Sequence, residues 1–547
     1  MKMFKNVMKL FVVATMALSI VACGGNEKKS DKVDAKDIEV VSAVGKEVEG
    51  VKVNMIPDNA LAALRITPEA LWNKVLYNLD TENYGFVRSM ISQLSEEAPI
   101  LNNLGSLGID LMEPVVASVA FEIKDVEPEM EGAFEACLVA SLDDREKFVK
   151  NLDKLVEMLD EEDALKVTKK DYDESYAHYM IFSDEEGAFD LGVFANAAVL
   201  RVTYDPSSDF KNMAKSMAKL FANGGPAKTE GLDKFYKSEA DAALWIDFDN
   251  SMKSLKPAFD MADDDVAKQL ETLIPLCKGA SLVSELDFYY GATSLEFSVY
   301  GSDKLKEQAL KYNKPASSKY FSYLPASSAV VLNVAIKDFP GLVEELSKTN
   351  EELADVFESL EELGFDEELY AGFPGQITLA VDGYEFGESE IPHFVLVMEC
   401  QRNVWNFLES YLKEYGDLVA SDMYCIEDKL YVGYNHGVIM AMDAETLYRS
   451  QSGTEESFAD TELAGEIRKG GMLVNLAALP YSALSEVAEE IDSSMSAYDL
   501  LDWVSSVVLA NSEDFMSATL TVNMRDQDHN ILSKILDEVI SRVNDSY

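Results

Sequence analysis

The apolar segments of this chain occur twice in the same order, and that repetition constrains its fold more than any other feature. Residues 56–60 (IPDNA) open a first series of apolar runs, and residues 324–328 (LPASS) open a second. Such repetition predicts two structural copies, because each copy has its own apolar face to bury. We predict a first repeat over residues 51–314 and a second over residues 315–547.

The matched segments predict the same elements in both halves. Two strand-like runs precede a helix whose apolar residues share one face, and three short strands joined by tight turns follow. The predicted strands are 115–123, 136–142, 176–182, 189–194 and 198–202, then 376–382, 394–400, 423–426, 430–434 and 438–442. The predicted helices are 148–159 and 405–415. This alternation predicts an α+β fold, internally duplicated, with antiparallel β-sheets packed against amphipathic helices.

A weaker repeat lies within each half. Residues 242–248 (AALWIDF) and 472–477 (MLVNLA) resemble the opening strands near Ala60 and Ala329. Each is followed by helical stretches, a hairpin and another helix. The chain therefore contains either four related units or generic amphipathic patterns that match by chance.

The N-terminus has the pattern of an exported, acylated protein. Residues 1–9 are basic, and residues 10–21 form an apolar run that is short for a membrane span of about 20 residues. The run ends at Cys23 in an Ile-Val-Ala-Cys sequence that resembles the lipobox of bacterial lipoproteins. We predict that residues 1–22 are a signal peptide, that Cys23 is acylated, and that residues 23–50 form a flexible tether.

An acylated Cys23 predicts where the protein resides. Each buried methylene of an acyl chain contributes about 0.8 kcal/mol, so two or three chains anchor a protein stably. We expect a bacterial cell-envelope protein, anchored by lipid at the outer membrane, that contacts the membrane through these acyl chains.

The charge of the chain limits its partners. It has 98 acidic and 47 basic residues, a formal net charge of −51. Such a surface repels phosphate backbones, so we expect no nucleic-acid partner.

The leader, the segment at 56–60, its echo at 324–325 and the length of the chain together resemble a family of Bacteroides-type lipoproteins that carry a domain of unknown function. This resemblance covers nearly the whole mature chain. It implies secretion and lipid anchoring, and it brings no established activity.

Motifs of catalytic or metal chemistry are absent from the sequence, which lacks zinc-binding pairs, calcium loops, phosphate loops and a nucleophile elbow. We therefore predict no cofactor and no metal site. Residues 247–250 (DFDN) at a strand end permit either a metal ligand or a helix cap, and cap preferences favour the second. The four histidines are scattered along the sequence, at positions 178, 393, 436 and 529.

Cysteines and aromatic clusters leave further alternatives open. Cys400 and Cys425 lie in predicted strands of the same half and either form a disulfide or remain buried free thiols, the more common state. The aromatic segments 288–290 (FYY) and 320–323 (YFSY) belong either to the core or to a sugar-binding face.

Two functional classes remain. One is a non-catalytic envelope protein that binds or scaffolds a protein or glycan, and the other is a hydrolase whose site combines residues distant in sequence. The matched positions of the two halves are mainly apolar, so the shared part is the core and not a catalytic set. The sequence therefore favours the binding protein.

Overall fold

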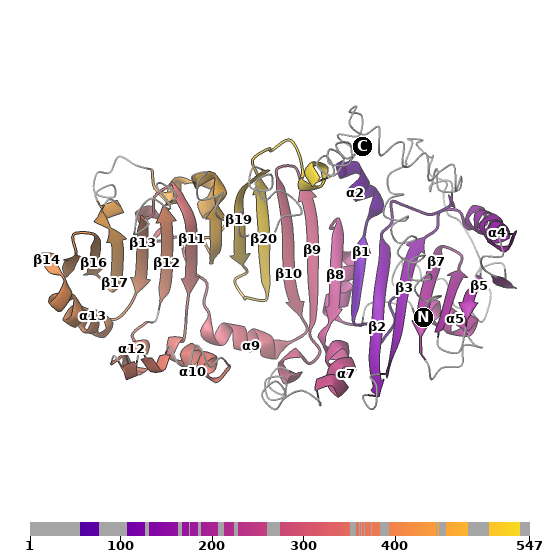
Figure 1. The fold of residues 1–547 in the computed structure, drawn as a ribbon, viewed down its shortest axis with the longest axis horizontal. Helices are drawn as coiled ribbons and strands as arrows, with labels where there is room; N and C mark the ends of the chain where they lie inside the picture. Colours follow the sequence, from indigo (N-terminus) through magenta and orange to yellow (C-terminus); the bar gives the residue numbers. More distant parts are fainter. Residues whose placement is uncertain are drawn as a thin grey trace. The chain divides into compact units, whose positions relative to one another are not determined.

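The structure is a computed structural model. It describes residues 55–75, 107–125, 131–161, 167–173, 176–183, 187–205, 213–223, 228–259, 274–349, 357–359, 361–362, 364–365, 367–373, 375–382, 393–444, 446–447, 456–479 and 503–535. These residues form two compact units. The first contains the described residues up to Phe288, Val299–Gly301 and those from Ile531 onward, and the second contains Tyr289–Ser298 and Ser302–Asn530. Both consist mostly of antiparallel β-strands with helices, so the predicted α+β class is confirmed (Figure 1).

Among the described residues of the first unit, nine strands form its sheet. They are β1 (Ala62–Ile66), β2 (Val115–Asp125), β3 (Glu131–Ser141), β4 (Thr168–Asp173), β5 (Tyr176–Ser183), β6 (Gly187–Val193), β7 (Ala197–Tyr204), β8 (Ala242–Asp247) and β9 (Ser281–Tyr289). Their order across the sheet is β9-β8-β1-β2-β3-β7-β6-β5-β4, and every pairing is antiparallel.

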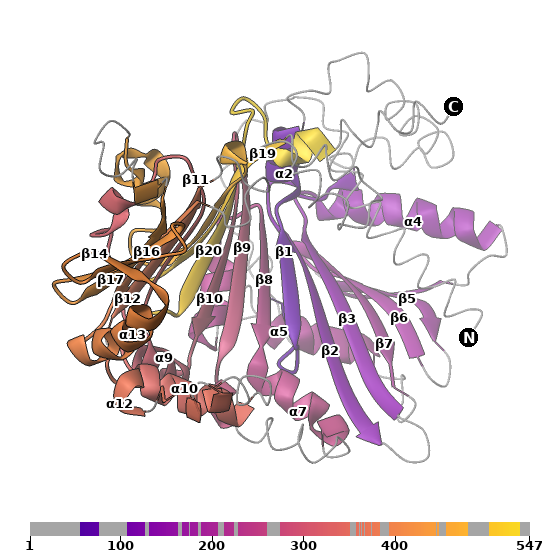
Figure 2. The ribbon, with the colours of Figure 1, turned by 60° about the vertical axis from the view of Figure 1, so that its left-hand side comes forward.

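Helices cover both faces of this sheet. They are α2 (Pro68–Val75), α4 (Arg145–Glu161), α5 (Met213–Asn223), α6 (Glu230–Lys237) and α7 (Phe248–Phe259). Successive residues of a strand point to opposite faces. Accordingly, Ala140 packs in the cluster that contains Phe148 of α4, whereas Val139 packs in the cluster that contains Met217 of α5. Helices α4 and α5 therefore lie on opposite faces of the sheet (Figure 2).

In the part of the second unit that the structure describes, the sheet has eleven strands. They are β10 (Ala292–Tyr300), β11 (Ser328–Ala335), β12 (Gln376–Asp382), β13 (Phe394–Glu399), β14 (Asp417–Ala420), β15 (Met423–Ile426), β16 (Leu430–Asn435), β17 (Val438–Asp443), β18 (Gly471–Asn475), β19 (Val504–Asn511) and β20 (Ser517–Met524). The order is β10-β20-β19-β18-β11-β12-β13-β17-β16-β15-β14, again entirely antiparallel.

Different helical elements pack on the two faces of the second sheet. They are α9 (Asp303–Tyr312), α10 (Phe339–Thr349), α12 (Glu367–Tyr370), α13 (Arg402–Tyr415) and the short 3₁₀ helices η6 (Phe321–Tyr323), η7 (Phe458–Asp460), η8 (Glu462–Gly465) and η9 (Leu476–Ala478). Trp405 and Leu412 of α13 pack on Tyr424 and Ile439 from one face of β15–β17. The opposite face contributes Tyr431, Met440 and Met442 to a separate cluster with η6 and η7.

The strands and helices predicted in both halves are present, with shifts of a few residues at their ends. Helix α2 starts at Pro68, directly after Thr67. The sequence does not predict the two edge strands β4 and β14, because neither has an alternating apolar pattern. From β9 to β4 in the first unit and from β19 to β14 in the second, the strands follow the same order.

Among the residues that the structure describes, no helix is long and apolar enough to cross a membrane. The predicted signal peptide, Cys23 and the tether to residue 50 lie outside the described residues.

Candidate ligand-binding cavity

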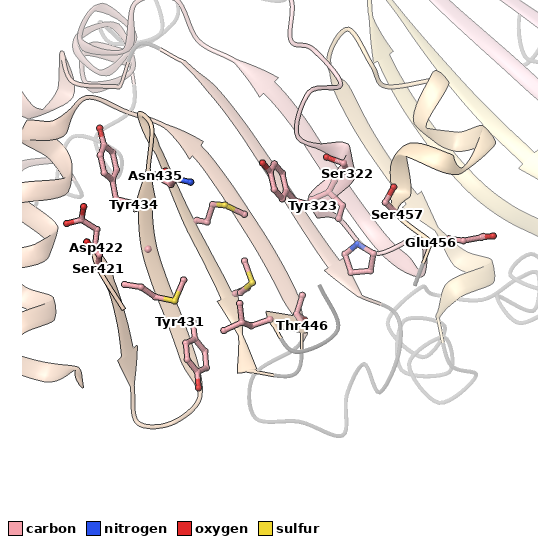
Figure 3. Close-up of a pocket in the computed structure, with 17 residues that line it drawn as sticks. Ser322, Tyr323, Ser421, Asp422, Tyr431, Tyr434, Asn435, Thr446, Glu456 and Ser457 are labelled. Atoms are coloured by element: carbon pink, nitrogen blue, oxygen red, sulfur yellow. The ribbon is translucent and has the colours of Figure 1, made fainter. Parts of the chain in front are cut away.

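A cavity of about 770 Å³ opens in the second unit, on the face of β15–β17 opposite α13. Its walls come from three places: the sheet, the segment around η6, and the residues that precede η7 (Figure 3). The described residues that line it are Ser322, Tyr323, Leu324, Pro325, Ser421, Asp422, Met423, Tyr431, Gly433, Tyr434, Asn435, Met440, Met442, Thr446, Leu447, Glu456 and Ser457.

Strand register explains the floor of the cavity. Met423, Gly433 and Met440 face one another across β15, β16 and β17, and Tyr431 faces Met442 in the neighbouring row. Residues paired in this way share a face of the sheet. The floor is thus mostly thioether and aromatic, and Gly433 leaves a gap in its middle. Methionine side chains adapt to irregular ligands, so this floor suits an apolar group.

The aromatic segment 320–323 is divided between the core and the cavity. Tyr320 and Phe321 are buried, and the Phe321 ring meets the Phe458 ring at 5.2 Å between centroids. Tyr323 is 48% exposed and lines the cavity. In Figure 3, Tyr323 and Ser322 lie across from Tyr431 and Thr446. The core alternative therefore holds for Tyr320 and Phe321, whereas the sugar-binding alternative for Tyr323 stays a prediction.

Several polar groups of the lining are already engaged in structural interactions. Arg402 donates to both carboxylate oxygens of Asp422, at 3.0 and 2.9 Å. The Ser457 hydroxyl donates to Asp460 at 2.7 Å within a capping box. Thr446 donates its hydroxyl to Asp443. These bonds hold Asp422, Ser457 and Thr446 in place around the apolar floor.

Asp443 joins the cavity wall to a buried histidine. It accepts from the Thr446 and Phe394 amides at 3.0 and 2.9 Å, and its Oδ1 lies 2.8 Å from Nδ1 of His393. Burial by itself raises the pKa of Asp443, but the hydrogen bonds from Thr446 and His393 outweigh it, so the pKa lies below its usual value. Through its contacts with His393 and Phe394, the carboxylate connects the end of β17 with the start of β13.

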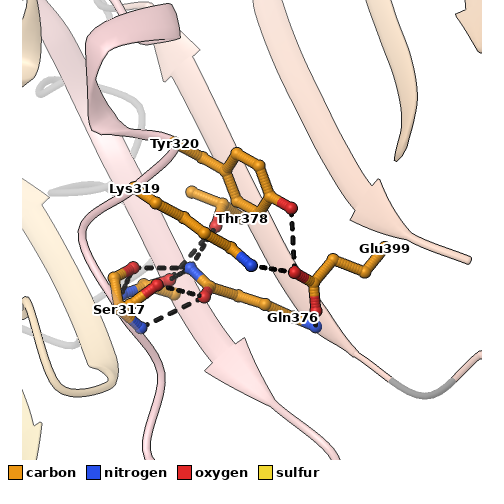
Figure 4. Close-up of polar contacts among 7 residues, drawn as sticks. Ser317, Lys319, Tyr320, Gln376, Thr378 and Glu399 are labelled. Atoms are coloured by element: carbon orange, nitrogen blue, oxygen red, sulfur yellow. Dashed lines mark hydrogen bonds and ion pairs between the residues drawn. The ribbon is translucent and has the colours of Figure 1, made fainter. Parts of the chain in front are cut away.

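A second polar network fills the core beside β11–β13 (Figure 4). The Gln376 amide donates to the Ser317 carbonyl at 2.6 Å and to Asn333 Oδ1 at 2.7 Å, and Thr378 donates to Asn333 at 3.1 Å. Glu399 accepts from Lys319, from the Tyr320 hydroxyl at 2.9 Å and from the backbone N–H of Gln376 at 2.8 Å. Asn333 also donates to the Ile467 carbonyl at 3.0 Å, so the network fixes the packing of the core around these strands.

The first unit contains a buried ionic cluster that sequence reasoning missed. Arg201 donates to Asp190 through Nε at 3.0 Å and Nη2 at 2.8 Å, and His178 Nε2 lies 2.8 Å from the same carboxylate. Ser216 and the Met213 carbonyl of α5 accept from Arg201 at 3.0 and 3.1 Å. The three charged or titratable residues stand on β5, β6 and β7, so only the strand pairing reveals their contact.

The predicted cysteine sites have different outcomes. Cys23 lies outside the described residues. Cys400 and Cys425 are buried free thiols, and burial raises the pKa of Cys400 to about 11. Cys400 follows β13 and Cys425 is on β15, with β17 and β16 between them, so three strand spacings alone separate them by about 14 Å, and the register adds a further offset along the strands. A disulfide needs Cα atoms within roughly 7 Å, so this fold favours the alternative of two free thiols.

Asp247 takes the capping role that the sequence favoured for it. Its Oδ1 accepts from the Asn250 amide at 2.8 Å, at the start of α7. Within the described residues, no group of three or more His, Cys, Asp or Glu side chains is arranged to hold a metal ion.

The sequence of residues 52–532, most of the chain, matches a family described as Domain of unknown function (DUF4836). No curated protein and no solved structure matches the chain.

Proposed function

The chain belongs to the DUF4836 family, whose function is unknown, and we propose that it is a lipid-anchored envelope protein that binds a ligand without converting it. The ligand is an uncharged molecule with an apolar part, held in the cavity of the second unit. The proposed location is the outer membrane of a bacterium, reached through acyl chains on Cys23.

The observation that carries this proposal is the composition of the cavity. Its floor combines Met423, Met440, Met442 and Tyr431, and its described lining residues include no lysine, arginine or histidine. Binding sites for small molecules are typically mostly apolar, with a few polar groups that set orientation, in a volume of about 300–1,000 Å³. The volume of about 770 Å³ falls in that range.

The hydrolase alternative has one observation in its favour, the set His393, Asp443 and Thr446 next to the cavity. In a catalytic triad the histidine accepts the nucleophile's proton and the carboxylate holds the other side of the imidazole. Here Thr446 donates to Asp443, and His393 contacts the same carboxylate. The carboxylate thus lies between hydroxyl and imidazole, an order that does not activate the hydroxyl. This geometry favours the binding protein.

A duplicated origin of residues 51–314 and 315–547 is part of the same proposal. It is supported by the common strand order and by one detail of register. Gly192 on β6 is paired with Val199, the third residue of β7, and Gly433 on β16 is paired with Met440, the third residue of β17. In the first copy, Met217 of α5 packs on this glycine, whereas in the second the glycine opens on the cavity. Duplication would explain why the same strand arrangement has a position covered by Met217 in the first copy and an open cavity in the second.

The binding proposal can be tested with Nile red, an uncharged fluorescent dye, and the full chain. We expect one saturable site, with an affinity at least tenfold lower in Gly433→Leu. A Cβ at Gly433 meets its neighbours at 3.5 Å or more, so the leucine fits the backbone and fills the cavity. Gly465→Leu is the matched control, because a Cβ there has nothing within 4 Å.

Two results would contradict the proposal. Equal dye affinity in Gly433→Leu and Gly465→Leu would show that the cavity is not the site. Turnover of nitrophenyl acyl esters by the wild type, lost in Thr446→Val, would establish the hydrolase instead.

A further inference from the structure

Strand β14 is an exposed sheet edge. In the part of the chain that the structure describes, it pairs with β15 and with no other strand. All four of its residues are exposed, including Leu418 at 64% and Val419 at 50%. An edge strand presents unpaired amides and carbonyls on its outer side, and here two large apolar side chains accompany them.

The end of α13 extends this apolar surface. Tyr411 and Tyr415 are 41% and 66% exposed, and Gly416 joins the helix directly to β14. We call Tyr411, Tyr415, Leu418 and Val419 the β14 patch. Exposed apolar groups gathered in one place indicate an interaction site more strongly than the same groups scattered.

The corresponding edge of the first unit is built differently. Strand β4 occupies the same place in the strand order and has the sequence TKKDYD. Lys169 on β4 binds Asp153 at 2.8 Å and lies over the Tyr179 ring at 5.3 Å. Charged residues on an edge strand prevent pairing with other chains. Strand β4 is therefore protected by charged side chains, whereas β14 has a single charge, Asp417, and is limited instead by its short length and its register shift.

We propose that β14 binds an extended segment of another protein, which adds a strand to the sheet and places apolar side chains on the β14 patch. Strand addition is a common mode of peptide recognition, in which backbone bonds give affinity and alternate side chains give specificity. The partner strand is short, because the register of β14 on β15 shifts between Leu418 and Ala420.

The net charge around β14 indicates which residues flank the apolar part of the partner segment. Residues 402–429, which include β14, contain three basic and six acidic residues, a net charge of 3 − 6 = −3. A second copy of this chain would bring the same negative charge to the edge, whereas a segment with lysine or arginine beside its apolar residues would complement it. The occupant is therefore a basic, apolar strand of a different protein.

A synthetic peptide of alternating valine and threonine, with lysines at both ends and a fluorescent label, tests this proposal by anisotropy with the full chain. We expect saturable binding, at least tenfold weaker when glutamates replace the lysines. Methylation of alternate backbone nitrogens of the peptide should abolish binding, because it removes the donors that a strand needs.

The decisive variant gives β14 the protection that β4 has. Leu418→Lys with Val419→Lys should lower peptide affinity at least tenfold, whereas Tyr289→Lys with Tyr290→Lys, at 53% and 55% exposed positions, should not. Unchanged affinity in the β14 variant would overturn the proposal. So would a wild-type dimer in light scattering that this variant dissociates, since the edge would then belong to a second copy. Neither outcome depends on the cavity, so the two proposals can fail separately.

Discussion

At the scale of single residues, the buried pair of Asp190 and Arg201 is the strongest electrostatic feature of the first unit. Arg201 is 2% exposed and Asp190 is fully buried, so each depends on the other. Breaking a buried pair by removing one charge costs about 3–5 kcal/mol. We expect Asp190→Asn to lower the local stability of β5–β7 by roughly 3 kcal/mol in hydrogen exchange. Asp171→Asn, on the exposed strand β4, should change it by less than about 0.5 kcal/mol.

The same carboxylate predicts a pH dependence. Burial raises the pKa of Asp190, but hydrogen bonds from His178 and Arg201 outweigh it and bring the pKa below its usual value. A carboxyl with a lowered pKa in the folded state stabilises above its unfolded pKa of about 3.9, and this stability is lost as the pH falls through the folded value. We expect acid to destabilise β5–β7 in the wild type below about pH 4, and Asp190→Asn to flatten that dependence. If the wild type and Asp190→Asn lost stability in acid to the same extent, another titrating group would be responsible.

At the scale of elements, the packing of α5 on β6 should make Gly192 respond to substitution differently from Gly433, which has the matching place in the strand order of the second unit. A Cβ at Gly192 would lie 2.6 Å from Met217 Cγ, whereas one at Gly433 would meet its neighbours at 3.5 Å or more. Overpacking of this kind costs about 1–3 kcal/mol. We expect Gly192→Ala to speed hydrogen exchange in α5, and Gly433→Ala to leave exchange in β16 and β17 unchanged. Equal effects would mean that α5 does not pack closely on β6.

The elements also show how far the sequence could lead. Strands β2, β3, β5, β6 and β7 were predictable because each contains a short apolar run of strand length, and β6 is buried along its whole length. Strand β14 was not, because only its pairing with β15 makes Asp417–Ala420 a strand. The cavity was beyond prediction for a similar reason. Its floor unites Met423, Gly433 and Met440 from three strands, and nothing in the local sequence distinguishes them from core residues.

At the scale of the whole molecule, the proposed anchor determines where both binding surfaces operate. Several acyl chains on Cys23 would confine the cavity and the β14 patch to the vicinity of a membrane, since each buried methylene contributes about 0.8 kcal/mol. A flexible tether over residues 24–50 would extend roughly 30 Å from that surface. An anchored binding protein needs no long-range attraction to its membrane, which fits a chain with a net charge of −51 that anionic lipids repel.

Replacing the proposed acylation site tests this arrangement. Cys23→Ala removes the thiol that would accept the lipid, so the variant should incorporate no labelled palmitate and should leave the membrane fraction or remain an uncleaved precursor. Cys277→Ala is the matched control, since it removes a half-buried free thiol outside the leader and should leave labelling unchanged. Labelling that persists in Cys23→Ala would place the lipid elsewhere. If the wild-type protein incorporated no label, the two binding proposals would stand, but the proposed membrane location would be wrong.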